Sequence, residues 1–209
     1  MISDNIAGHV FTGALLGLTA GISPGPLLAL VVSETLRNNR FAGFRIAMAP
    51  LITDAPIIVL SFIVFMRIYQ VDLFMGIISF AGSLFLIFLG LECIRTKGLN
   101  SGTGGGKRSP LLKGIIINLL NPHPYLYWIT VGTPIAVGAY ENGFGNVFAF
   151  FITFYLSLVG SKIIIAVLVD RSKGFLNNRI YTWIMRILGI SLFVFAVMFL
   201  LEGLKSFQN

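Results

Sequence analysis

The sequence predicts an all-α integral membrane protein with six transmembrane helices, arranged as two inverted three-helix repeats. Hydrophobic residues make up 56% of the 209-residue chain and charged residues only 11%, with a mean hydropathy of +0.89. Soluble domains carry roughly 25% charged residues, so the composition excludes an ordinary soluble protein. Six apolar runs are each long enough to cross a ~30 Å hydrocarbon core, which takes about 20 residues of helix. Two of these runs contain a Pro-x-Pro break at matching places.

The six runs fall into two groups of three, separated by a glycine-rich segment. The runs lie at residues 10–32, 46–66, 73–91, 114–139, 147–169 and 180–201. We expect the segment between the third and fourth runs to be a flexible linker. The predicted domains are therefore a first repeat at 1–95, a cytoplasmic linker at 96–110 and a second repeat at 111–209. Because three is an odd number of spans, the two repeats insert with opposite orientations.

The distribution of Lys and Arg predicts the orientation in the membrane. The three connections on one side carry Arg37, Arg40 and Arg45, then Arg95, Lys97, Lys107, Arg108 and Lys113, then Arg171, Lys173 and Arg179. The connections and termini on the other side carry only Arg67 and Lys205. By the positive-inside rule, we expect a multi-pass plasma-membrane protein with both termini outside. Contact with anionic lipid explains the basic residues, and no nucleic acid is expected as a partner.

The first run contains a glycine stripe followed by a helix break. Glycine recurs every four residues, at Gly13, Gly17, Gly21 and Gly25. This spacing predicts a bare stripe on one helix face, where a second backbone can approach closely. Pro24 and Pro26 lack backbone donors and interrupt the helix. Ser23 followed by Pro24 is typical of an N-cap and a first helical residue, which predicts that a new half-helix starts there.

The fourth run repeats this arrangement, with Asn121-Pro122-His123-Pro124 in place of Ser23-Pro24-Gly25-Pro26. A broken membrane helix is tolerated only where protein or a water-filled cavity satisfies the freed backbone groups. Each half-helix is expected to direct its positive dipole end and free N–H groups toward the bundle centre. The donors that remain are the amides of Gly25, Leu27, His123 and Tyr125. They suit a carboxylate or another anion, although proline kinks that only shape the bundle are an alternative.

Asp54 lies inside the second run, between Pro50 and Pro56, where a charge costs at least ~2.5 kcal/mol. Lys162 lies at a similar depth in the fifth run, so the two residues can form a coupling or charge pair. Asp54 could bind a substrate amine or carry a proton, and a static ion pair is the alternative. Lys162 could instead extend to the interface.

Amide and imidazole groups complete the candidate site. Asn118 could bond across helices or to a ligand, and His123 could shuttle protons. The candidate substrate-binding residues are Gly21, Pro24, Gly25, Pro26, Asp54, Asn118, Asn121, Pro122 and His123. No cofactor or metal is expected, because the sequence shows no CxxC motif and no His cluster. No enzyme activity is expected either: a membrane thiol carrier needs a second cysteine beside Cys93, and an intramembrane aspartyl protease needs a second Asp.

The chain resembles the lysine-exporter (LysE/RhtB-type) family. The resemblance lies in Gly17-x-x-x-Gly21-x-x-Pro24-Gly25-Pro26, in the acidic Asp54 and in Asn121-Pro122, and it covers the chain in length and span count. The family usually has Lys and then a small residue after Asn-Pro, where this chain has His123 and Pro124.

This resemblance implies secondary active export of amino acids or related small zwitterionic solutes, coupled to a proton or sodium gradient. A metal-cation or inorganic-anion exporter of the wider superfamily is the alternative, and it would predict acidic or His clusters. The expected partners are a small-molecule substrate and the lipid bilayer, with association into a homo-oligomer left open.

Overall fold

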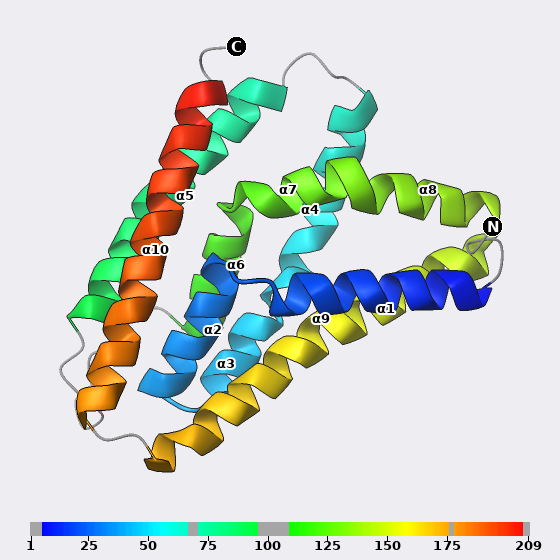
Figure 1. Ribbon diagram of the computed structural model, residues 1–209. Helices are drawn as coiled ribbons and strands as arrows, with labels where there is room; N and C mark the ends of the chain where they lie inside the picture. The colour runs from blue at the N-terminus through cyan, green and yellow to red at the C-terminus, as the bar shows by residue number, and fades with distance from the viewer. Residues whose placement is uncertain (1–5, 67–70, 96–108, 176–177, 207–209) are drawn as a thin grey trace.

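The computed structural model describes residues 6–66, 71–95, 109–175 and 178–206, and its regular elements are all helices (Figure 1). Three helices are long and apolar enough to cross a membrane, namely Arg40–Ser61, Phe144–Ser172 and Asn178–Lys205. The pair Ile6–Ile22 and Pro26–Arg37 qualifies as a fourth span, bent by 62° at its break. The all-helical membrane class is therefore confirmed. The six spans and the inverted repeat stay predictions.

Helices α1 to α5 correspond to the first three apolar runs. The first run forms α1 (Ile6–Ile22) and α2 (Pro26–Arg37), the second forms α3 (Arg40–Ala47) and α4 (Ala49–Met66), and the third forms α5 (Val71–Ile94). Asn39 begins α3 as an N-cap, with its Oδ1 accepting a hydrogen bond from the Ala42 amide at 3.2 Å. This cap turns the chain back directly after α2, so α2 and α3 pack against each other.

The second half of the chain begins with an interrupted helix. It comprises α6 (Pro110–Leu119), α7 (Pro122–Tyr127), a π-helical turn (Trp128–Gly132) and α8 (Thr133–Glu141). Two long helices follow, α9 (Phe144–Ser172) and α10 (Asn178–Ser206), with a short 3₁₀ turn (Lys173–Phe175) after α9. Most of the predicted linker, including Lys97, Lys107 and Arg108, lies outside the described residues.

The glycine stripe of α1 packs directly against α9 (Figure 1). A Cβ atom on Gly13 or Gly17 would overlap a backbone carbonyl oxygen of α9, that of Phe150 or Phe154 respectively. A Cβ atom on Gly21 would overlap the Ser161 hydroxyl. Small residues thus allow the two backbones to approach closely, as the spacing predicts. Gly25 is the exception: the helix ends at Ile22, and nothing lies within 4 Å of a Cβ built at Gly25.

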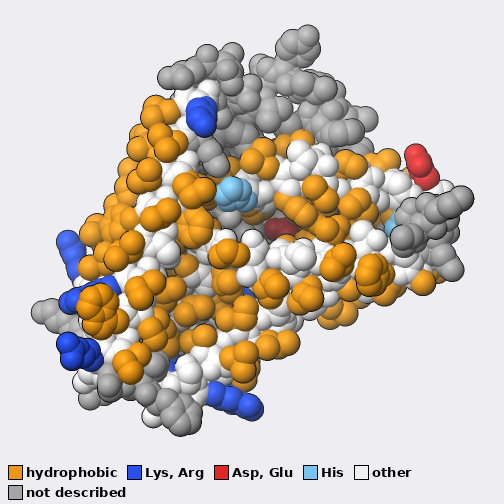
Figure 2. All heavy atoms as spheres, viewed as in Figure 1, with side chains coloured by type: hydrophobic (Ala, Val, Ile, Leu, Met, Phe, Trp, Pro, Cys, Tyr) orange, Lys and Arg blue, Asp and Glu red, His pale blue; other side chains and the backbone are white. Residues whose placement is uncertain are grey.

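A second close helix pair, α5 with α10, forms the opposite side of the molecule (Figure 1). Gly90 and Gly189 face each other in this pair, and a Cβ on Gly189 would lie 2.9 Å from the Gly90 carbonyl oxygen. The outer helix faces carry exposed apolar side chains, for example Leu156, Ile164, Ile187 and Val197. Figure 2 shows such side chains over most of the visible face. The hydrophobic effect favours covering this surface with lipid.

A buried ion pair joins the two halves of the chain. The Lys113 ammonium of α6 lies 2.8 Å from Glu34 Oε1 of α2, and both side chains are only 3% exposed. Asn38 Nδ2 donates to the other carboxylate oxygen, also at 2.8 Å. The sequence had placed Lys113 among the charges of a cytoplasmic connection. That placement is wrong because α6 begins at Pro110, so Lys113 lies within the first turn of the helix and faces α2.

Candidate functional site

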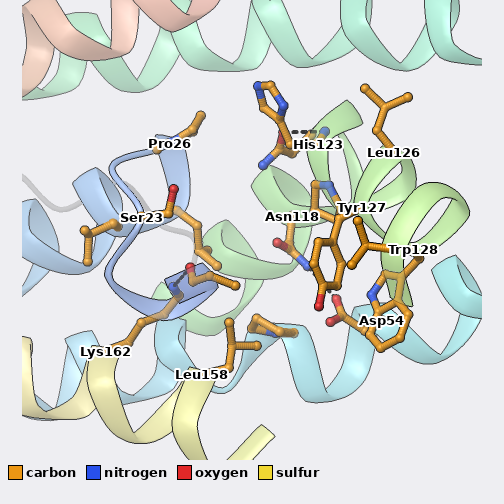
Figure 3. A pocket seen from close by; sticks show the side chains of 18 of the residues that line it. Ser23, Pro26, Asp54, Asn118, His123, Leu126, Tyr127, Trp128, Leu158 and Lys162 are labelled. Carbon is orange, nitrogen blue, oxygen red and sulfur yellow. Dashed lines mark hydrogen bonds between the residues drawn. The ribbon is translucent and has the colours of Figure 1, made fainter. Parts of the chain in front are cut away.

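A cavity of about 490 Å³ lies where the two helix breaks meet α4 and α9. Figure 2 shows this face of the molecule hollowed at its centre, with an acidic side chain inside the hollow. Residues that line it come from both halves of the chain, as the close view in Figure 3 shows. The volume lies within the roughly 300–1,000 Å³ that is usual for small-molecule sites.

The first break contributes the segment from Ser23 to Leu28 to the cavity lining. Helix α2 starts at Pro26 with Gly25 in extended conformation as its N-cap, and no side chain caps it. The prediction of Ser23 as N-cap is therefore wrong; Pro24 and Gly25 lengthen the break, and the new helix starts two residues later than expected. Because the first N–H groups of a helix have no intrahelical acceptor, the amides of Leu27 and Leu28 remain available as donors at the cavity.

At the second break, a side chain of the break itself caps the start of the new helix. Asn121 is the N-cap of α7, as predicted, and its Oδ1 accepts the His123 amide at 3.0 Å. The expectation that the His123 amide would serve a substrate is therefore wrong, because the Asn121 side chain occupies it. The His123 ring points away from this cap toward α10, with its centroid 5.6 Å from that of Phe199. The two breaks thus differ: only the first has an uncapped helix start.

Asp54 lies on α4 at one side of the cavity and is 5% exposed. Asn118 Nδ2 donates to its Oδ1 at 3.1 Å, and the Tyr155 hydroxyl donates to its Oδ2 at 3.2 Å. Asn118 also donates to the Thr53 hydroxyl at 2.6 Å, and the Trp128 indole lies beside the carboxylate (Figure 3). These donors come from two helices, α6 and α9, and from the π-helical turn, and they fix the position of the carboxyl group.

Lys162 lies on α9 across the cavity from Asp54 (Figure 3) and is 3% exposed. Its ammonium donates to the backbone carbonyl oxygens of Gly21 at 2.8 Å and Ala20 at 3.3 Å. These carbonyls end α1, so the cation sits at the negative end of that helix dipole. Lys162 therefore does not reach the interface, which was the alternative. The described ion pairs do not include one between Lys162 and Asp54, although both charges line the same cavity.

The structure brings together most of the predicted site. The cavity is lined by Pro24, Gly25, Pro26, Asp54, Asn118, Asn121, His123 and Lys162. Gly21 contributes its carbonyl oxygen to Lys162 and not a lining surface, and Pro122 is buried behind the cap.

Aromatic and aliphatic side chains form the remaining wall of the cavity. Tyr127 stacks on Phe154 with centroids 5.7 Å apart, and Trp128 meets the same ring edge-on at 5.4 Å. Tyr127, Trp128 and Tyr155 were not among the candidate residues that the sequence predicted. Phe154 and Leu158 were not identified, because an apolar side chain in a membrane helix carries no sequence signal for a cavity.

The LysE type translocator family model matches residues 18–203, which is most of the chain. The match includes both breaks, Asp54 and Lys162. The chain belongs to the LysE type translocator family. Members of this family are transporters and not enzymes, and they carry amino acids or other small solutes out of the cell. The cavity is therefore a candidate translocation site. No curated protein and no solved structure gave a significant match to the chain.

A metal-binding function has no support in the described part of the chain. Across those residues, no three His, Cys, Asp or Glu side chains come close enough together to hold a metal ion. The Asp54 carboxylate is bound by amide and hydroxyl donors instead.

Proposed function

We propose that this LysE-type translocator is a secondary active exporter of amino acids or related small zwitterionic solutes, coupled to a proton or sodium gradient. One observation carries the proposal: a single cavity has a carboxylate on one side and an ammonium with an uncapped helix start on the other. A zwitterion carries the complementary pair of charges. Its ammonium would lie at Asp54, and its carboxylate would lie at Lys162 and the amides of Leu27 and Leu28.

The arrangement of helices supports alternating access by two inverted repeats. The close pair α1–α9 joins the first span of one repeat to the second span of the other. When the two repeats are exchanged, the equivalent contact joins the second span of the first repeat to the first span of the second repeat. This contact is also present, between α4 and both α6 and the π-helical turn. In transporters of this kind, the substrate site lies at discontinuous helices between the repeats. Both breaks line one cavity here, as such a mechanism requires.

Charges at the helix ends support the proposed orientation in the plasma membrane. The Lys173 ammonium donates to the Asn38 carbonyl oxygen at 3.0 Å, so the connection after α2 and the end of α9 lie on one side. Arg37, Arg40 and Arg171 are near these ends. We assign this side to the cytoplasm by the positive-inside rule, which places both termini outside. Residues 1–5 and 207–209 lie outside the described residues.

Asp54 is the residue on which the proposed coupling depends. Its carboxylate would serve as counter-charge for the substrate amine or as the carrier of a proton. Asp54→Asn preserves the side-chain volume and removes the charge, so we expect it to abolish gradient-driven export while the protein still inserts and folds.

The test is efflux of radiolabelled amino acids from preloaded proteoliposomes under an imposed pH or sodium gradient. Asp170→Asn is the matched control, because Asp170 is a partly exposed carboxylate at the end of α9, paired with Lys173 at 3.0 Å. Export by monodisperse Asp54→Asn at the wild-type rate would mean that Asp54 is structural. Dependence on only one of the two gradients would identify the coupling ion.

The alternative function is export of a metal cation or an inorganic anion. A cation site would need several carboxylates or imidazoles around one point, and the described lining of the cavity contains one of each. An inorganic anion would use Lys162 and the start of α2 but would leave Asp54 without a role. The zwitterion accounts for both charges.

A further inference from the structure

We infer that the substrate of this cavity is an amino acid with an uncharged, apolar side chain. This inference rests on the proposed function and narrows it. It comes from two properties of the cavity that the family membership does not specify, namely the balance of its charged groups and the apolar character of much of its remaining lining.

The charges of the cavity balance those of one zwitterion. In the described lining, Asp54 supplies the one carboxyl group and Lys162 the one amino group. Lysine or arginine as substrate would bring a second cation, and no second carboxylate lines the described cavity to receive it. Glutamate or aspartate would bring a second anion. An unpaired charge in a buried site is strongly unfavourable, so both classes should bind poorly.

The basic side retains hydrogen-bond donors for a substrate carboxylate. An ammonium has three donors, and two of those on Lys162 are directed at the Gly21 and Ala20 carbonyls. One donor remains, together with the amides of Leu27 and Leu28 at the start of α2. On the acidic side, Asn118 and Tyr155 each donate to one Asp54 oxygen, with the Trp128 indole beside them. A carboxylate has about four acceptor positions, so one remains for a substrate ammonium.

Much of the remaining lining of the cavity is apolar. It includes Leu126, Trp128, Val131, Phe154 and Leu158, together with the ring of Tyr127. The aromatic rings pack against one another: Tyr127 stacks on Phe154, and Trp128 meets Phe154 edge-on and stacks on Phe151 at 5.6 Å between centroids. A side chain that enters this part of the cavity gains from burial of each methylene, about fourfold in affinity per group.

The test compares the export rates of several amino acids by the purified full-length protein in proteoliposomes. Efflux is measured for L-leucine, L-phenylalanine, L-alanine, L-lysine and L-glutamate. We expect leucine and phenylalanine to be exported at least ~10-fold more efficiently than lysine, glutamate or alanine. Leucinamide, which lacks the carboxylate, and 4-methylpentanoate, which lacks the ammonium, should fail to compete with leucine.

A designed variant tests the charge balance directly. Thr130 lines the cavity and is exposed, and Thr130→Glu would add a second carboxylate to the lining. We expect it to raise the lysine-to-leucine efflux ratio at least ~10-fold over wild type, whereas the control Thr130→Gln adds no charge and should not raise the ratio.

The outcomes separate this inference from the function on which it rests. Export of lysine or glutamate at the leucine rate would overturn the inference and leave the exporter function standing. An equal lysine-to-leucine ratio in Thr130→Glu and Thr130→Gln would also overturn it. Failure of the monodisperse protein to export any of the five amino acids would overturn the proposed function itself.

Discussion

The buried ion pair between Glu34 and Lys113 leads to a quantitative prediction about stability. Lys113→Met keeps a long, flexible side chain in α6 and removes the cation. The Glu34 carboxylate then remains buried, 3% exposed, with the Asn38 amide as its hydrogen-bond donor at 2.8 Å. Loss of one partner from a buried pair typically lowers the free energy of unfolding by about 3–5 kcal/mol. For a chain of this length, that corresponds to a fall of roughly 6–20 °C in Tm.

The assay is thermal unfolding of the purified variants in detergent, followed by the loss of the monodisperse peak. Lys173→Met is the matched control, because Lys173 forms an ion pair with Asp170 in which the side chains are 20% and 26% exposed. Pairs with such solvent contact contribute about 0.2–1 kcal/mol, so the control should lower Tm by only a few degrees.

A double variant distinguishes an unpaired charge from lost packing. Glu34→Gln removes the negative charge and keeps an acceptor for Asn38, so Glu34→Gln combined with Lys113→Met should recover most of the lost stability. If Lys113→Met lowers Tm no more than Lys173→Met does, the reasoning about this pair is refuted. If the double variant is no more stable than Lys113→Met alone, packing and not charge decides the effect.

Two further predictions concern helix packing and topology. Gly17→Ala would place a methyl group against the Phe154 carbonyl oxygen, so it should lower the free energy of unfolding by about 1–3 kcal/mol in the same thermal assay. The control Gly160→Ala should have little effect, because nothing lies within 4 Å of a Cβ at that position. In a Cys93→Ala background, Asn142→Cys should react with an impermeant thiol reagent in intact cells and Ser109→Cys only after permeabilisation; labelling of Ser109→Cys from outside would reverse the proposed orientation.

The sequence alone determined the features that depend on local backbone chemistry. Pro24 and Pro26 cannot complete a helix, and Pro122 after Asn121 starts one, so both breaks were predictable from neighbouring residues. The four-residue spacing of glycine predicted a close helix contact because spacing fixes which residues share a helix face. The position of Asp54 inside an apolar run likewise predicted a carboxyl group away from water, and the side chain is 5% exposed. Each of these inferences needs only a few consecutive residues.

The tertiary structure decided which of these groups meet. Glu34 and Lys113 form an ion pair although they lie 79 positions apart in the sequence. The residues next to each of them in the chain do not predict its partner. Lys162 turned out to lie on the carbonyls that end α1, and Asp54 to be held by Asn118 and Tyr155. The physical reason is that side-chain partners depend on helix crossing and rotation, which are set by packing over whole helices. Local sequence determines where a helix starts and ends, whereas the faces of the neighbouring helices determine which groups its side chains bind.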